Sequence, residues 1–267
     1  MARAGTTRTL TADRVTSALV DDGVRLVRGL GAGASTRTAG DASLMITGVP
    51  IPTLNGVLTV RPTATAADVG DLLDVVARHN LPHSILMRPG CRSELVRLAK
   101  QRGMVKDDPL PLMAVLLPSD RIRQASHHAN LAIRVLDPDE GGIHAAIAAD
   151  GFEAPLEMFE QLIPRPVLAQ TGNHAYVGRV DGRDVVTAFS STAGDHVGIF
   201  NVATPAAHRG RGYGTAITAR AVLDGFDAGA TFAYLQSSPA GLRIYESLGF
   251  RTLETWSVWV TPGQPPH

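Results

Sequence analysis

The hydrophobic pattern of the C-terminal half predicts a mixed sheet with helices around it. Short runs of β-branched and aromatic residues, typical of strands, alternate there with segments of helical spacing. Polar turns at 181–183 and 192–195 connect three successive strands, as expected for antiparallel hairpins. The expected strands are 131–136, 174–180, 184–191, 196–204 and 231–236, and the expected helices are 139–150, 155–163, 212–225 and 242–248.

A strand, a turn, a helix and a second strand occur in the same order near the end of each half. The first set is expected at 84–90, 94–102 and 112–117, and the second at 231–236, 242–248 and 255–260. This order indicates a weak internal duplication, although two such units can also resemble each other by chance. At about 150 residues per domain, a chain of 267 residues has room for two domains. The polar stretch 118–130 predicts the boundary, giving α+β domains at 1–125 and 126–267.

Composition is that of a folded protein and excludes a largely disordered chain, with 44% hydrophobic and 19% charged residues. Lys+Arg and Asp+Glu are both 25, which argues against binding to nucleic acid or membrane through the overall charge. The N-terminus lacks the apolar run of a signal peptide, and no apolar stretch reaches the roughly 18 residues of a membrane helix. We therefore expect a cytoplasmic protein.

Two groups of residues suggest chemistry but have plainer explanations. Cys91 is the single cysteine, so it has no disulfide partner in the chain, and it lies outside any recognisable nucleophile motif. His127 and His128 are adjacent, but without a third ligand nearby they fit a solvated linker better than a metal site. We expect no metal.

The segment that carries chemistry is a glycine-rich loop between a strand and a helix, Arg209-Gly-Arg-Gly-Tyr-Gly214. Glycines permit close backbone approach, and several N–H groups of such a loop can point toward one anion at the helix N-terminus. Arg209 and Arg211 add positive charge for phosphate groups. The loop is not a P-loop, because no lysine follows its glycines. It does not fit a dinucleotide-binding fold either, because the strands before it are expected to be antiparallel and no acidic residue follows at a suitable spacing.

This loop resembles the cofactor signature of the GNAT superfamily of acyl-CoA-dependent N-acyltransferases, Arg/Gln-x-x-Gly-x-Gly/Ala. Residues 235–250 (LQSSPAGLRIYESLGF) resemble its second signature, in which a strand leads to a helix that bears a tyrosine and ends at Gly-Phe. The first half resembles the degenerate half of tandem members. Its segment 47–56 (TGVPIPTLNG) has no such loop, so no CoA cradle is expected there.

The resemblance implies two GNAT-like domains, each a mixed, mainly antiparallel sheet flanked by helices, and acetyl-CoA as cosubstrate. The strand before the loop is expected to splay from its neighbour and pair with pantetheine, while loop amides hold the pyrophosphate. The residues that match these cofactor-binding positions are Val202, Ala203, Thr204, Arg209, Gly210, Arg211, Gly212, Tyr213, Gly214 and Thr215. Tyr245 matches the tyrosine that protonates the departing thiolate, and a core aromatic on an amphipathic helix is its alternative role.

The general base is less well defined. His196 and Glu153 are candidates, with Asp195 and Glu157 beside them, because histidine titrates near neutral pH and the glutamates lie near the expected acceptor site. Each also fits a plain role in a turn, a strand edge or a solvated helix face.

The resemblance predicts transfer of an acetyl group to a primary amine of a small-molecule or amino-acid-like acceptor, by direct attack in a ternary complex. An aminoacyl-tRNA-dependent transferase and a non-catalytic acyl-CoA sensor are the alternatives. The CoA-type loop and the zero net charge argue against the former. Neither nucleic acid nor membrane is an expected partner. Two domains in one chain favour a monomer over a homodimer.

Overall fold

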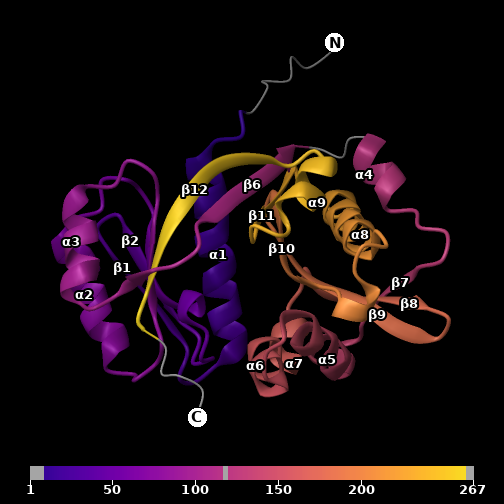
Figure 1. Cartoon of the computed structure of the whole chain (residues 1–267), viewed down its shortest axis with the longest axis horizontal. Helices are drawn as coiled ribbons and strands as arrows, with labels where there is room; N and C mark the ends of the chain where they lie inside the picture. Colours follow the sequence, from indigo (N-terminus) through magenta and orange to yellow (C-terminus); the bar gives the residue numbers. More distant parts are fainter. Residues whose placement is uncertain (1–8, 117–119, 263–267) are drawn as a thin grey trace.

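The computed structural model describes residues 9–116 and 120–262, and its two halves lie on either side of helix α1 (Figure 1). The helices, in chain order, are α1 (Ala12–Leu30), α2 (Ala66–Ala77), α3 (Ser93–Gln101), α4 (Asp120–Ala125), α5 (Gly141–Phe152), α6 (Leu156–Leu162), α7 (Arg165–Leu168), α8 (Tyr213–Asp227) and α9 (Leu242–Ser247), with 3-10 turns η1 (Pro52–Leu54), η2 (Pro138–Glu140) and η3 (Ala206–His208). The strands are β1 (Ser35–Ala39), β2 (Ala42–Ile46), β3 (Asn55–Thr59), β4 (Ser84–Met87), β5 (Val105–Lys106), β6 (Leu110–Leu116), β7 (Ala132–Val135), β8 (Asn173–Val180), β9 (Arg183–Ala193), β10 (His196–Ala203), β11 (Phe232–Gln236) and β12 (Arg251–Val260).

One mainly antiparallel sheet runs through both halves. Its order over the described residues is β1-β2-β3-β4-β12-β6-β11-β10-β9-β8-β7, with β5 added at β12. In the N-terminal half β1, β2 and β3 pair antiparallel and β3 pairs parallel with β4. In the C-terminal half β8, β9 and β10 pair antiparallel and β10 pairs parallel with β11. This repeated pairing order supports the internal duplication inferred from the sequence.

The last strand of each half pairs with the other half. Strand β6, which belongs to the first 125 residues, pairs antiparallel with both β11 and β12. Strand β12 pairs with β6 through Arg251–Trp256 and with β4 through Ser257–Val260. In Figure 1 it arches from the C-terminal half to the N-terminal half. Each half therefore contains a strand supplied by the other.

Amphipathic helices cover the sheet and form separate cores. Ile217 of α8 is fully buried against strands of the C-terminal half, and Leu72 of α2 is buried against the N-terminal strands. Between them, Val15 of α1 packs in a third cluster with Trp256 of β12. The spacing of such buried residues on one helical face is the reason these segments fold as surface helices.

The α+β class, the mainly antiparallel sheet and the expected C-terminal elements are confirmed. The Asp181-Gly182 turn joins β8 to β9 with φ of 48° and 78°, the left-handed pair that a two-residue hairpin turn requires. Strand β12 begins at 251, earlier than the expected 255, because its first residues pair with β6. Helix α4 lies within the stretch expected to be a linker. Residues 117–119, which include the end of the expected strand 112–117, lie outside the described residues, and the division at 125/126 stays a prediction.

Candidate active site

The candidate site begins where β10 separates from β11. The two strands pair only at His196–Gly198, opposite Phe232–Tyr234, and the rest of β10 runs on without pairing to β11. Its pairing with β9 is interrupted between Phe200 and Ala203, where Asn201 has φ of 48°. A bulge of this kind bends a strand and leaves backbone groups without a strand partner. The splay expected of the strand before the glycine loop is therefore present.

The glycine-rich loop leads directly into the N-terminus of α8. Gly210 and Gly212 have φ of 76° and 80°, conformations that side chains rarely adopt, and Gly212 is the N-cap residue. No side chain of the described residues caps this helix. Its first N–H groups, from Tyr213 to Thr215, have no acceptor within the helix. The loop and the helix end therefore offer donors and partial positive charge to an anion.

Side chains from outside the loop hold it in place. His128 contacts the carbonyl of Arg211 through Nε2 at 2.9 Å, and its ring lies edge-on to Tyr213 with centroids 5.1 Å apart. The Arg209 guanidinium donates to the carbonyls of Thr204 at 3.0 Å and Gly151 at 2.7 Å. Arg209 thus ties the loop to the end of β10 and to α5. His128, which the sequence placed in a solvated linker, instead supports the loop.

Tyr245 lies on α9, beside the splayed strands. Its ring packs edge-on against Phe250 with centroids 6.1 Å apart, and the side chain lines a cavity together with Val202 and Gln236. Burial raises the pKa of Tyr245 to about 12. The phenol therefore stays protonated at neutral pH and is suited to donate a proton, not to accept one.

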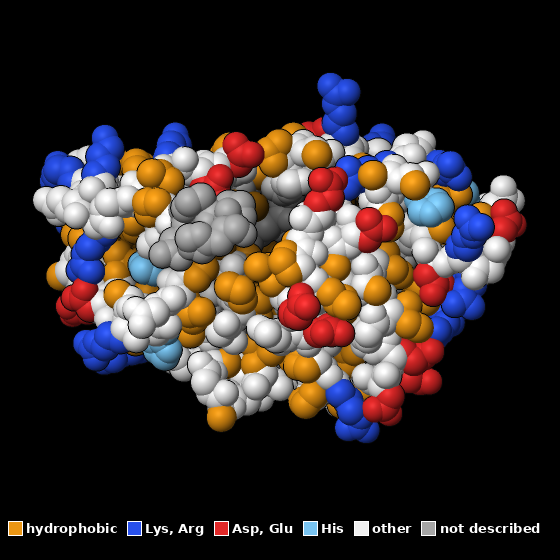
Figure 2. All heavy atoms as spheres, turned by 60° about the horizontal axis from the view of Figure 1, so that its bottom comes forward, with side chains coloured by type: hydrophobic (Ala, Val, Ile, Leu, Met, Phe, Trp, Pro, Cys, Tyr) orange, Lys and Arg blue, Asp and Glu red, His pale blue; other side chains and the backbone are white. Residues whose placement is uncertain are grey.

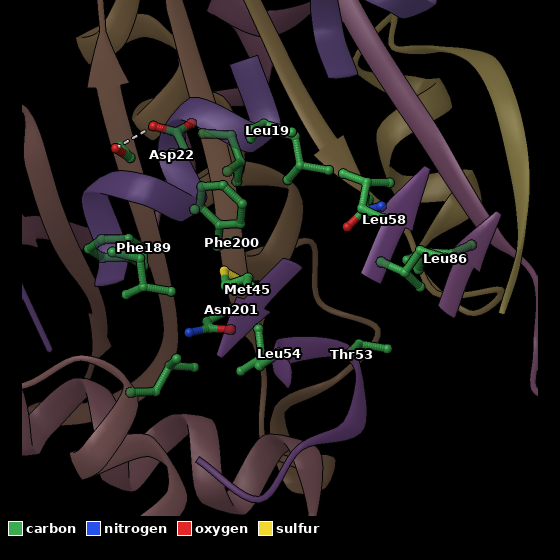
Figure 3. Close-up of a pocket in the computed structure, with 18 of the residues that line it drawn as sticks. Leu19, Asp22, Met45, Thr53, Leu54, Leu58, Leu86, Phe189, Phe200 and Asn201 are labelled. Carbon is green, nitrogen blue, oxygen red and sulfur yellow. Dashed lines mark hydrogen bonds between the residues drawn. The ribbon is translucent and has the colours of Figure 1, made fainter. Parts of the chain in front are cut away.

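The cavity has a volume of about 380 Å³ and lies between the two halves. Its lining is mostly apolar. Figure 3 shows Met45, Leu54 and Leu58 from the N-terminal half, with Phe189 and Phe200 from the C-terminal half. Lining residues outside that view's labels include Leu26, Ser43, Leu110, Phe152, Ile163, Asn173, Ser191, Ile199, Val202, Gln236, Ser238 and Tyr245. The volume lies within the range of roughly 300–1,000 Å³ usual for small-molecule sites.

Asp22 of α1 is the one charged residue among the described residues that line this cavity. Its side chain is 4% exposed. Ser191 Oγ donates to its Oδ1 at 2.8 Å and the Tyr234 hydroxyl donates to its Oδ2 at 2.5 Å. Burial, and then the neighbouring Asp22 carboxylate, raise the pKa of Tyr234 well above its usual value. Tyr234 therefore remains a donor to Asp22.

Comparison with known proteins assigns a family to part of the C-terminal half. Residues 145–250 match the family model described as the Acetyltransferase (GNAT) family. These residues form a GNAT acetyltransferase domain. No curated protein matches the chain.

Solved structures extend the likeness of fold to nearly the whole chain. A GCN5-related N-acetyltransferase from Kribbella flavida is 24% identical, with a TM-score of 0.66 and coverage of 96% of this chain and 98% of that one. A tandem GNAT protein from the clavulanic acid biosynthesis pathway is 12% identical, with a TM-score of 0.54 and coverage of 97% and 98%. A GCN5-related N-acetyltransferase from Sphaerobacter thermophilus is 14% identical, with a TM-score of 0.59 and coverage of 84% and 78%.

The GNAT domain at residues 145–250 supports acetyl transfer from an acyl-CoA donor. The residues present fit that donor, because the GNAT domain has an uncapped helix N-terminus after a glycine loop and splayed strands beside it. Among the described residues, no group of three His, Cys, Asp or Glu is placed to hold a metal ion. None of the helices described here is long and apolar enough to cross a membrane.

The candidate bases of the GNAT domain do not line the cavity. Glu153 follows α5 with φ of 55°, and its carboxylate is 76% exposed and 3.7 Å from Arg209. Glu157 is exposed in the first turn of α6. His196 is buried in β10 and faces a smaller pocket that Asp195 also lines. His196 Nε2 lies 3.3 Å from Asp22 Oδ2, so it reaches the cavity only through Asp22.

Sequence reasoning missed two polar residues of the cavity, Asp22 and Gln236. Asp22 could have been found from the sequence, because helical spacing places it on one face with Val15 and Ala18. An acidic residue on a buried helix face is unusual and indicates a specific role. Gln236 lines the cavity, and its Nε2 is buried without a partner among the described residues. Nothing local distinguishes Gln236 from any other polar residue at a strand end.

Proposed function

We propose that the protein transfers the acetyl group of acetyl-CoA to a primary amine of a small-molecule or amino-acid-like acceptor. One observation carries the proposal: the splayed end of β10 and Tyr245 border the same cavity, and the glycine loop follows β10 after the short turn η3. A donor held along β10 would present its thioester to that cavity. The transfer we propose is direct, with both substrates bound together.

Backbone groups supply most of the proposed donor site. Val202, Ala203 and Thr204 lie at the splayed end of β10 and are assigned to the pantetheine arm. The loop from Arg209 to Thr215 is assigned to the pyrophosphate, which an uncapped helix N-terminus favours. Acetyl-CoA brings an acyl group activated as a thioester. The protein orients it and excludes water.

The proposed chemistry then rests on two groups of this chain. The neutral amine attacks the acyl carbon, the carbon–sulfur bond breaks, and the proton that the new amide nitrogen loses goes to water. A backbone N–H of the splayed strand stabilises negative charge that develops on the acyl oxygen during this attack. The Tyr245 hydroxyl holds the proton needed by the leaving thiolate, and its raised pKa keeps that proton in place until charge develops on sulfur. Tyr245 is therefore assigned as general acid.

Surface charge favours a small acceptor over tRNA. Figure 2 shows basic side chains gathered mainly toward the ends of one face, with a mostly hydrophobic and uncharged middle that includes a few acidic groups. A tRNA-sized ligand requires many phosphate contacts along a basic surface. On this face the basic side chains do not form such a continuous surface.

Replacing Tyr245 tests the assignment. We expect Tyr245→Phe to lower kcat by about 100-fold or more, the usual contribution of a general acid, with a change of less than about threefold in KM for acetyl-CoA because the phenol acts on the leaving group. Tyr176→Phe is the matched control, since burial raises the pKa of the Tyr176 phenol too, but this residue does not line the cavity. Thiol release from acetyl-CoA gives the rates. Mass spectrometry of an amine panel identifies the acetylated product.

Three results would count against this proposal. An unchanged kcat in Tyr245→Phe removes the tyrosine from the mechanism. CoA binding with no acetylated amine in the panel favours a sensor. Failure to bind CoA at all removes the donor site.

A further inference from the structure

The cavity combines a mostly apolar wall with a buried carboxylate, that of Asp22. Apolar side chains from both halves, mainly leucine, phenylalanine, valine and isoleucine, make up more than half of its lining. Such a surface contributes little binding free energy to a polar ligand, but it stabilises a ligand that buries apolar area against it. The polar lining residues of the described chain are uncharged except Asp22, whose carboxylate lies on the wall of this mostly apolar space (Figure 3).

A carboxylate so placed requires compensation. Removing a charge from water destabilises the protein unless hydrogen bonds and an opposite charge offset that cost. Asp22 receives hydrogen bonds from Ser191 and Tyr234, which are neutral donors. Within 9–116 and 120–262, its ion-pairing contact is with His196 at 3.3 Å, and no arginine or lysine is paired with it.

The carboxylate also has capacity for a further donor. Its two oxygens can accept about four hydrogen bonds. Ser191 and Tyr234 each donate one, and His196 Nε2 lies 3.3 Å from Oδ2, so about one acceptor position remains. Because the side chain lines the cavity, the remaining acceptor capacity is open to a bound molecule there. An ammonium group fits, since it is compact, positively charged and carries three donors.

We propose that this cavity is the acceptor site, that it takes a primary amine attached to an aliphatic or aromatic body, and that Asp22 binds its ammonium group. The ammonium gives one proton to water before the free amine attacks the thioester. This inference rests on the proposed function and narrows its acceptor to an apolar amine. It also gives the N-terminal half a specific task. Helix α1 supplies the charge that orients the acceptor, while the GNAT domain supplies the donor loop.

Binding to the CoA-saturated protein tests the inference without requiring turnover. The probes are 2-phenylethylamine, its neutral counterpart 2-phenylethanol and the small polar amine ethanolamine, measured by isothermal titration. We expect 2-phenylethylamine to bind at least about tenfold more tightly than either of the others, since it alone combines an apolar body with a charged donor. Equal or tighter binding of ethanolamine would overturn the apolar acceptor.

Asp22→Asn then isolates the charge. Asparagine keeps the shape and can still accept from Ser191 or Tyr234, so we expect about a tenfold or greater loss of 2-phenylethylamine affinity and unchanged 2-phenylethanol affinity. Asp21→Asn is the matched control, because Asp21 is exposed and adjacent on α1. An unchanged 2-phenylethylamine affinity in Asp22→Asn, or equal losses of affinity for both ligands, would show that Asp22 does not bind the ammonium group.

A second variant keeps the proposal testable if Asp22→Asn does not fold. Leu54→Trp enlarges a lining side chain on η1 and is expected to weaken 2-phenylethylamine while leaving CoA affinity intact. If octanoyl-CoA instead binds more tightly than acetyl-CoA and Leu54→Trp abolishes that preference, the cavity belongs to the donor and the inference fails. Asp22-dependent amine binding without any acetylation would contradict the proposed function alone. Acetylation of polar amines that is insensitive to Asp22→Asn would contradict this inference alone.

Discussion

His144 lies on α5, completely buried, with its ring 2.7 Å through Nδ1 from the Thr187 hydroxyl. Thr187 in turn donates to the carbonyl of Tyr176 at 2.8 Å, so the histidine is anchored to β8 through β9. Burial lowers the pKa of His144 to about 4. The ring is therefore neutral at any pH at which the protein is expected to work, and its role is structural.

The lowered pKa of His144 predicts how stability depends on pH. Unfolded histidine titrates near 6.5, so as pH falls below 6.5 the unfolded chain takes up a proton that the folded chain refuses until about pH 4. The free energy of unfolding therefore has its full value above pH 6.5 with respect to His144. It decreases by about 3 kcal/mol as the pH falls from 6.5 to about 4. Urea unfolding between pH 7 and about pH 4 measures this slope.

His144→Gln is expected to remove that part of the slope, since glutamine can replace the hydrogen bond but does not titrate. His79→Gln, at an exposed position of the N-terminal half, should keep the wild-type slope. If His144→Gln and the wild type lose stability in parallel as the pH falls, His144 is not the group responsible.

The element on which the donor site depends most is the N-terminus of α8. Gly212 begins this helix with φ of 80°, and Gly229 follows it with φ of 105°. A Cβ has room at both positions, as its nearest neighbour at Gly212 is 3.7 Å away in His128 and Gly229 has none within 4 Å among the described residues. Alanine at either position therefore strains the backbone without a steric clash.

Gly212→Ala and Gly229→Ala should each cost about 1–2 kcal/mol of stability, the penalty for a left-handed backbone with a side chain. Only Gly212→Ala should also weaken CoA, by about tenfold, because it displaces N–H groups assigned to the pyrophosphate. Thermal unfolding and isothermal titration of CoA separate the two effects. Equal CoA affinities in both variants would show that the start of α8 does not hold the donor.

Elements could be predicted from the sequence where the determinants are local. The glycine loop, α8 and the tyrosine-bearing α9 follow from contiguous motifs, and the hairpins follow from turn residues such as Asp181-Gly182. Helix α1 illustrates the limit. Its Asp22 reaches Ser191 and Tyr234 across sequence separations of 169 and 212 residues. No local pattern encodes which distant strand such a helix covers, so the cavity could not be predicted from the sequence.

At the scale of the whole molecule, the exchanged strands connect the two halves. Strand β6 completes the sheet of the C-terminal half, and β12 pairs with β4 of the N-terminal half. Separating the halves would break these ladders and expose Trp256, which is fully buried. The similarity between the two halves does not predict this exchange, because the sequences of β6 and β12 are those of ordinary terminal strands. The halves are thus expected to fold as one unit.

The tryptophans make that expectation measurable. The chain has two, Trp256 and Trp259, and both lie on β12. Trp256 packs in the central cluster with Val15, whereas Trp259 packs in the N-terminal core with Leu72. Trp259→Phe and Trp256→Phe therefore leave single reporters of different regions. In each variant, urea unfolding followed by tryptophan fluorescence should coincide with unfolding followed by far-ultraviolet circular dichroism, in one transition. A fluorescence midpoint that precedes the circular dichroism midpoint in either variant would mean that the halves unfold separately, and that the shared strands do not couple them.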